Sequence, residues 1–179
     1  MINLKMLCIQ NDKEKIKNYL SDKNRDDAKI ESMFAYVLIN KMESLFFVFS
    51  DDIKSNINTC YNKNKFFEYA CLGGNINIVK WFLETYNISN FPTCLNCAIR
   101  SNNPDLIFFL LDNGGDIYIN NNGGEIMIDA ITLENGKLAK KLVDKKIDIE
   151  NVKITINKTI KDEYKSKYFN TLNFFRTNF

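Results

Sequence analysis

Apolar and polar positions along this chain follow a pattern that recurs about every 30 residues. Two stretches align position by position: ACLGGNINIVKWFLE at 70–84 and AIRSNNPDLIFFLLD at 98–112. The stretch AITLENGKLAKKLVD at 130–144 repeats this pattern, and LCIQNDKEKIKNYLS at 7–21 repeats it more weakly. Each copy holds two short segments with the apolar period of a helix, separated by a two-residue turn. The pattern therefore predicts an array of helix-turn-helix pairs.

A fifth copy lies at 33–49, where either Ala35 or Tyr36 takes the position that alanine holds in the clearest copies. With Tyr36, this position falls at 7, 36, 70, 98 and 130. Such uneven spacing is expected when the loops between repeats differ in length and the helices do not. We expect the small residues at this position to let neighbouring first helices approach closely; they are Ala70, Ala98 and Ala130.

The turn of each copy carries residues that suit the end of one helix and the start of the next. Gly74, Asn102 and Asn11 can adopt the left-handed conformation that ends a helix. The residue that follows the turn can cap the next helix with a side-chain oxygen. These predicted caps are Asp12, Asn75, Asn103 and Asn135.

The second helix of each copy has an apolar stripe too wide for an isolated helix in water, so we expect neighbouring pairs to bury it. Phe46 and Phe108 occupy a position that holds lysine in the other copies. Two interpretations are open for these phenylalanines. They are either exposed residues of a contact patch, or residues that a rotated helix buries.

After Glu150 the repeat fades. Apolar residues then recur about every four positions, which predicts a final amphipathic helix that covers the end of the stack. These residues are Ile156, Ile160, Tyr164, Tyr168, Leu172 and Phe175. The alternative is a tail that binds a membrane or a partner, because this segment also holds an aromatic cluster. The cluster consists of Phe169, Phe174, Phe175 and Phe179.

Residues 2–150 resemble the ankyrin repeat family. TCLNCA at 93–98 is similar to the family's TPLHxA, and NGGDI at 113–117 is similar to its xGADV. The hexapeptide is degraded in every copy, and the turn at 134–136 looks displaced by one residue relative to the family's glycine. The resemblance implies an all-α, ankyrin-type helix-turn-helix solenoid of about five repeats plus a C-terminal capping helix. We expect one domain over 1–179, with repeats near 2–21, 31–50, 65–84, 93–112 and 125–144 and the cap at 152–179.

Charge and composition narrow the class of protein. The 24 basic and 22 acidic residues are interspersed, so they favour neither a nucleic acid nor a membrane surface as a partner. No apolar run is long enough to span a bilayer, and the N-terminus has no signal-peptide pattern. Five cysteines, mostly inside helical patterns, indicate buried thiols in a reducing compartment, so we expect a cytoplasmic protein.

The amino-acid usage of the chain indicates the kind of genome that encodes it. The 26 Asn, 22 Ile and 21 Lys against 3 Arg suggest an AT-rich genome, such as that of a large DNA virus, a protist or an intracellular bacterium. A viral or bacterial origin would make a host protein the partner.

The chain offers few groups for catalysis. It has no histidine, the commonest proton shuttle. The only metal-like spacing is Cys94-x-x-Cys97, which lacks the second pair of ligands that a zinc site needs. We therefore expect no catalytic residue, cofactor or metal. A small metal- or thiol-dependent enzyme that uses Cys94 and Cys97 is the alternative.

The resemblance implies a protein-binding scaffold whose concave face is formed by finger tips and inner helices. The finger positions are Asn62, Asn64, Ser89, Asn90, Asn121 and Asn122, and residues 120–124 should form a full finger tip. The inner-helix positions are Leu72, Arg100, Ser101, Thr132 and Leu133. Apart from Arg100 this face is uncharged and amide-rich, which favours hydrogen-bonded recognition. We expect an intracellular adaptor or inhibitor that is monomeric, with self-association through the aromatic C-terminal segment as the alternative.

Overall fold

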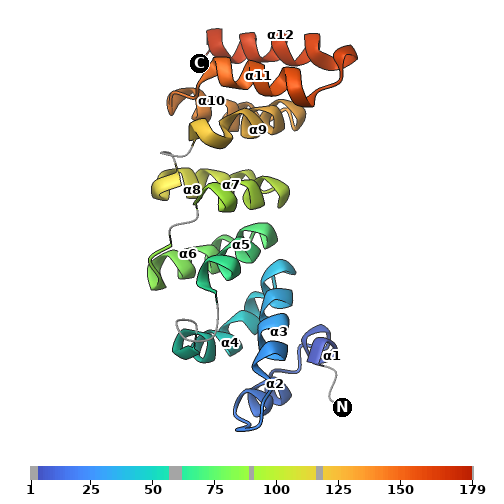
Figure 1. Cartoon of the computed structure of the whole chain (residues 1–179), viewed down its shortest axis with the longest axis vertical. Coiled ribbons are helices and arrows are strands. Elements are labelled where there is room, and N and C mark those ends of the chain that lie inside the picture. The colour runs from blue at the N-terminus through green and yellow to red at the C-terminus, as the bar shows by residue number, and fades with distance from the viewer. Residues whose placement is uncertain (1–3, 57–61, 89–90, 116–118, 179) are drawn as a thin grey trace. The chain divides into compact units, whose positions relative to one another are not determined.

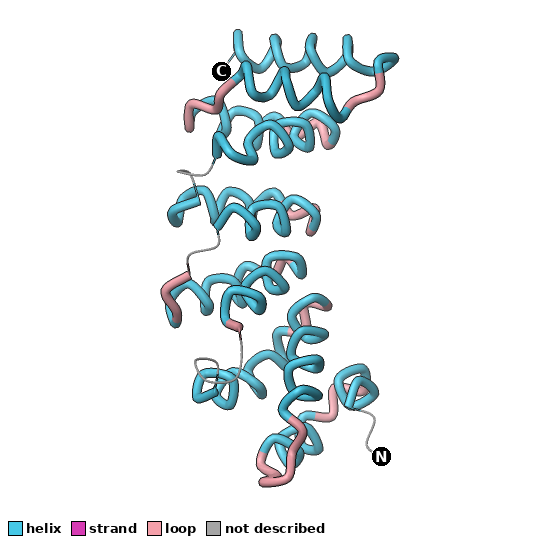
Figure 2. Tube along the Cα trace, in the orientation of Figure 1, coloured by secondary structure: helices cyan, strands magenta, loops and turns pink. Residues whose placement is uncertain are grey.

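The computed structural model describes residues 4–56, 62–88, 91–115 and 119–178, and the residues in these ranges form helices and turns without a strand (Figure 2). The predicted all-α class is confirmed for these residues. The chain divides into two compact units, Met1–Asn90 and Phe91–Phe179, which we call unit 1 and unit 2. None of the described helices is long and apolar enough to cross a membrane.

Unit 1 contains three successive helix pairs (Figure 1). The first helices of these pairs are α1 (Leu4–Ile9), α3 (Asp27–Ile39) and α5 (Lys63–Gly73). The second helices are α2 (Lys13–Leu20), α4 (Glu43–Asn56) and α6 (Ile76–Thr85). Each first helix packs on the next first helix, and each second helix packs on the next second helix. We call these two sets the inner and the outer helices.

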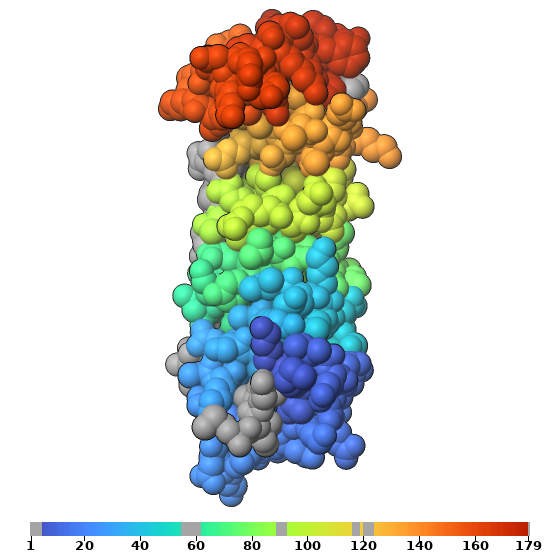
Figure 3. Space-filling view, turned by 90° about the vertical axis from the view of Figure 1, so that its right-hand side faces the viewer, coloured from blue at the N-terminus to red at the C-terminus, as the bar shows by residue number. Residues whose placement is uncertain are grey.

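Unit 2 continues the same arrangement, with inner helices packed on inner helices and outer on outer. The inner helices are α7 (Phe91–Arg100), α9 (Ile119–Thr132) and α11 (Ile149–Thr159). The outer helices are α8 (Pro104–Leu110), α10 (Gly136–Asp144) and α12 (Asp162–Asn178), and the π-helical turn η1 (Leu111–Gly115) follows α8. Successive pairs of this unit form successive layers, coloured from yellow-green to red in Figure 3.

One turn geometry joins the two helices in each of the five pairs from α1 and α2 to α9 and α10. Asn11, Gly74 and Asn102 have φ of 53°, 80° and 54°, as predicted, and Lys41 and Glu134 have φ of 58° and 52°. The N–H of the next residue donates to the carbonyl of the residue five positions earlier, as in Asp12 to Leu7 (2.9 Å), Met42 to Val37 (3.0 Å) and Asn135 to Ala130 (2.8 Å). This Schellman geometry satisfies carbonyls that the end of a helix would otherwise leave unpaired. The turn at 134–136 is not displaced, because Glu134 takes the place of Gly74.

All four predicted helix caps are confirmed. In each case a side-chain oxygen accepts a hydrogen bond from a backbone N–H three residues later, and the donor–acceptor distances lie between 3.0 and 3.3 Å. The donors are the N–H groups of Lys15, Ile78, Leu106 and Leu138 for the caps Asp12, Asn75, Asn103 and Asn135. These bonds satisfy amides at the start of each outer helix that have no partner within the helix.

The register of the second repeat differs from the sequence prediction. Lys41 holds the left-handed position, so the equivalent of Ala70 four residues earlier is Val37, which is fully buried. Neither Ala35 nor Tyr36 occupies that position. The sequence concealed this register because lysine and valine stand where the two clearest copies have a turn former and an alanine.

The corrected register also explains the outer-helix phenylalanines. Met42 stands in the cap position, so Phe46 aligns with the buried Val79, and Phe47 aligns with Lys80. Phe46 is fully buried, whereas Phe47 is 52% exposed. The contact-patch interpretation is therefore wrong for Phe46, and the exposed phenylalanine of this helix is its neighbour. Phe108 is half-buried.

Residues 120–124 form the first turns of α9 and not the predicted finger tip. Gly124 is buried against α11, and a Cβ atom at this glycine would lie 2.3 Å from Thr155 Oγ1. Ile119 and Ile126 are also buried. Packing of this segment on the next inner helix thus overrides the turn preference of its asparagines and glycines.

The expected single C-terminal helix is divided in two. Ile160 is extended (φ −95°, ψ 135°) and ends α11, and α12 then begins at Asp162. Val152 and Ile156 of α11 are buried, as are Leu172 and Phe175 of α12. The aromatic cluster is therefore partly used in packing, while Phe174 remains 57% exposed and Phe179 lies outside the described residues.

The two units have chemically different cores. In unit 1 the ring of Phe34 lies 5.8 Å from Phe46, 5.8 Å from Phe49, 4.9 Å from Phe66 and 6.5 Å from Phe82, measured between ring centroids. Such edge-to-face and tilted pairs add to the stability gained by burial. In unit 2 the buried positions are mainly aliphatic, as in Leu95, Leu106, Leu110, Ile126, Leu138 and Leu142.

The left-handed turn position predicts opposite effects for two substitutions. Glu134→Gly should raise the free energy of unfolding by about 0.5–1 kcal/mol, because glycine adopts positive φ without steric cost. Gly74→Ala should lower it by about 1 kcal/mol for the converse reason. Urea denaturation of the two variants and the wild type measures both changes. A loss of stability in Glu134→Gly would contradict the assigned turn.

The core of unit 1 generates a second prediction. Phe34→Ala should lower the free energy of unfolding by about 3–5 kcal/mol, because it leaves a cavity among four other rings. Phe47→Ala is the matched control, and its effect should stay within about 0.5 kcal/mol because this ring is exposed. Chemical denaturation followed by circular dichroism compares the two. Equal losses would show that the register of α4 is wrong.

Candidate functional site

The predicted partner-binding residues of unit 1 are only partly accessible. Asn62 caps α5 with its Oδ1, which accepts a hydrogen bond from the Lys65 N–H at 3.2 Å. Asn64 and Leu72 are half-buried. Ser89 and Asn90 lie outside the described residues, and Asn121 and Asn122 of unit 2 lie in α9 with side chains that the structure does not describe.

The other predicted residues of unit 2 lie at the ends of α7 and α9, just before the turns. Ser101 Oγ donates to the Ala98 carbonyl at 2.7 Å. Thr132 Oγ1 donates to the Ile128 carbonyl at 2.8 Å and lies 2.8 Å from the Tyr168 hydroxyl of α12. Both side chains thus have partners within the unit, and Thr132 helps to hold the last helix. Leu133 remains 47% exposed.

A groove of about 470 Å³ runs over the inner helices of unit 2. We call it the inner groove. Residues from α7 and α9 and the C-terminal end of α11 line it: Asn96, Ile99, Arg100, Glu125, Ile128, Asp129, Thr159 and Ile160. Of the predicted partner-binding residues, Arg100 is the one that the structure places in this groove.

The inner groove carries charges of both signs, Arg100 from α7 and two carboxylates from α9. Glu125 and Asp129 are one helical turn apart on α9, which brings both carboxyl groups to one side of the helix. Burial raises the pKa of Asp129 above its ordinary value, and the negative charge of Glu125 raises it further.

The geometry of the inner groove suits binding more than catalysis. Three isoleucines supply apolar contact area, and two carboxylates and a guanidinium supply hydrogen-bonding groups that fix the orientation of a bound partner.

Possible metal ligands and cysteines are the other candidates for a functional site. Among the described residues, no three His, Cys, Asp or Glu side chains gather in a way that could hold a metal ion. Cys94 is fully buried and Cys97 half-buried, and burial raises the pKa of the Cys8 thiol to about 11.

Sequence reasoning missed most residues of the inner groove. The four-residue spacing of Glu125 and Asp129 was a usable signal, because it places two like charges on one face of a helix. The prediction that 120–124 form a loop hid this signal, since it placed Glu125 at a helix start where a carboxylate is common. Ile99 and Ile128 gave no signal beyond their helical periodicity.

Comparison with known proteins identifies the family. A family model described as ankyrin repeats, in three copies, matches residues 67–153. This part of the chain, from within α5 to within α11, is similar to ankyrin repeats, and the predicted resemblance is confirmed over these residues. A search of curated proteins and a search of solved structures find no match. Ankyrin repeats are generally protein–protein interaction modules.

The carboxyl pair of the inner groove predicts a pH-dependent contribution to stability. The pKa of Asp129 is higher in the folded than in the unfolded chain, so the folded chain binds more protons between those two values. The contribution of Asp129 to stability therefore falls as the pH rises through this window. We expect Asp129→Asn to be more stable than the wild type at neutral pH and to lose this advantage at acidic pH.

Urea denaturation at several pH values measures this difference, and Asp105→Asn, at an exposed position of α8, serves as the control. In the Glu125→Gln variant, the pKa of Asp129 should move back toward its ordinary value, which carboxyl NMR titration detects. A pKa of Asp129 that does not respond to Glu125→Gln would contradict the assigned electrostatic coupling.

Proposed function

We propose that this protein is an intracellular adaptor or inhibitor that binds a partner protein through the concave, inner-helix face that ankyrin repeats imply. Within unit 2 the proposed contact is the inner groove. The observation that supports this proposal most directly is the combination of Ile99, Ile128 and Ile160 with Arg100, Glu125 and Asp129 in one groove.

Each part of this combination has a physical role in protein recognition. The isoleucines lose water when a partner covers them, which provides a favourable free energy of association. The charged groups orient the partner and disfavour wrong ones, because an unpaired charge that becomes buried costs free energy. Arg100 is exposed, and arginine is among the residues that most often contribute strongly to binding.

We propose no catalytic activity for this protein. We propose a cytoplasmic monomer that binds a single partner, and a host protein as that partner if the chain comes from a virus or an intracellular bacterium. Adaptor and inhibitor differ in whether the partner keeps its activity when bound. An activity assay of the identified partner, with and without this protein, distinguishes them.

The test begins with affinity capture from the native cell and identification of the partner by mass spectrometry. The affinity is then measured by calorimetry for the wild type and for Arg100→Glu, which should weaken binding about tenfold or more, equivalent to at least about 1.4 kcal/mol. Arg176→Glu is the matched control, because Arg176 is an exposed arginine of α12 that does not line the groove.

A second variant, Ile128→Asp, tests the apolar part of the groove. It should also weaken binding, while circular dichroism and the melting temperature show whether the fold is retained. The proposal fails if both groove variants bind the partner as tightly as the wild type and Arg176→Glu do.

A further inference from the structure

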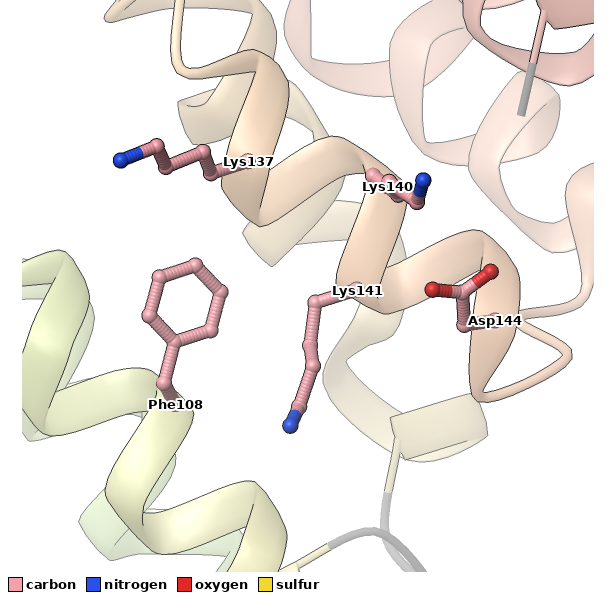
Figure 4. A pocket seen from close by; sticks show the side chains of 5 residues that line it. All are labelled: Phe108, Lys137, Lys140, Lys141 and Asp144. Carbon is pink, nitrogen blue, oxygen red and sulfur yellow. The ribbon is translucent and has the colours of Figure 1, made fainter.

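A second groove lies on the outer helices of unit 2, between α8 and α10 (Figure 4). We call it the outer groove. Its volume is about 320 Å³, and its lining residues are Phe108, Lys137, Lys140, Lys141 and Asp144. In Figure 4 the ring of Phe108 faces α10, with the side chain of Lys137 above it and that of Lys141 to its right.

Phe108 stands at a position that faces solvent in the outer helices. The equivalent residues, five positions after the cap, are Lys80 in α6 and Lys140 in α10, and both are exposed. A lysine is therefore compatible with the fold at this position. Phe108 is half-buried and lines the groove, so part of its apolar ring can contact a partner.

Positive charge is concentrated beside this ring. Residues 135–147 hold five lysines and one aspartate, whereas the whole chain has 24 basic and 22 acidic residues. Lys141 Nζ lies 2.6 Å from Asp112 and Lys145 Nζ lies 3.7 Å from the same carboxylate. One carboxylate thus serves two lysines, and the groove itself is lined by three lysines and one aspartate.

We propose that the outer groove binds an acidic segment of a partner protein. An apolar side chain of that segment packs on Phe108, and its carboxylates pair with the ammonium groups of the groove. Charge complementarity argues for this occupant, because three lysines and one aspartate line the groove together with the aromatic ring of Phe108. This surface is separate from the inner groove, so the proposal does not depend on the proposed function.

Two features favour a protein segment over a nucleic acid. The lysines lie along one helix of nine residues, about 14 Å long, which is short for a surface that tracks a phosphate backbone. The groove is also lined by lysine without arginine, whose planar guanidinium suits bidentate contacts with phosphate. The aromatic ring of Phe108, in contrast, adds affinity for an apolar side chain.

The test uses a fluorescently labelled peptide in which a central leucine is flanked on each side by two glutamates. Its affinity for the full chain is measured by fluorescence anisotropy. A peptide with glycine in place of leucine, and an unrelated DNA duplex of 20 base pairs, are measured in parallel. We expect the leucine peptide to bind with a Kd below about 1 mM, to lose affinity as salt is added, and to bind more tightly than the glycine peptide.

Phe108→Lys separates the proposed mode of binding from simple attraction of a polyanion. The variant adds a positive charge and removes the aromatic ring. Binding of the leucine peptide should therefore weaken about fivefold or more, whereas a ligand held by charge alone would bind more tightly. The double variant Lys137→Glu, Lys140→Glu should bind the leucine peptide about tenfold more weakly than the wild type does. Lys80→Glu, at the position of α6 equivalent to Lys140, should leave the affinity unchanged.

The location of binding is checked by NMR. Chemical-shift changes on addition of the leucine peptide should centre on α8 and α10, and the Arg100→Glu variant should bind this peptide like the wild type. Three results would overturn the proposal: no binding of the peptide at about 1 mM, tighter binding by Phe108→Lys, or a DNA duplex that displaces the peptide from the groove.

Discussion

The structure depends on burial of apolar surface between successive helix pairs. Its helices have 6 to 17 residues, and helices of that length are marginally stable in water by themselves. Each pair presents an apolar surface that it cannot cover alone, so the next pair has to cover it. Both units satisfy this constraint, with rings around Phe34 in one and aliphatic side chains in the other. The constraint fixes which faces of the helices are unavailable for binding and therefore which remain free.

The turn between the helices of a pair makes this packing uniform. It keeps one geometry, with a left-handed residue followed by a residue that begins the outer helix, although five different positions use asparagine, glycine, lysine and glutamate for the left-handed residue. Because the turn fixes the phase of the outer helix, it also determines which side chain faces solvent. That is why a one-residue difference in register exposes Phe47 and buries Phe46. Residues at solvent-facing positions can then differ between repeats without cost to the scaffold.

The two grooves of unit 2 illustrate this division of roles. Each lies between neighbouring helices of the same set, the inner groove on α7, α9 and α11 and the outer groove on α8 and α10. Their chemistry differs: Glu125 and Asp129 dominate the charge of one, and the lysines of α10 dominate the other. The inner and the outer helices of unit 2 therefore carry two separate surfaces of different charge.

The sequence by itself determined the helix pairs, the caps and the residues of most turns, because these depend on interactions within a few residues of the chain. Asn75 and Asn103, for example, cap their helices as their local context predicts. Only the tertiary structure decided whether 120–124 form a loop or a helix, since the close contact of Gly124 with Thr155 is made by a residue 31 positions away. It also decided which charged residues share a groove. Arg100, Glu125 and Asp129 come together through the packing of neighbouring inner helices, and no local pattern in the chain records that packing.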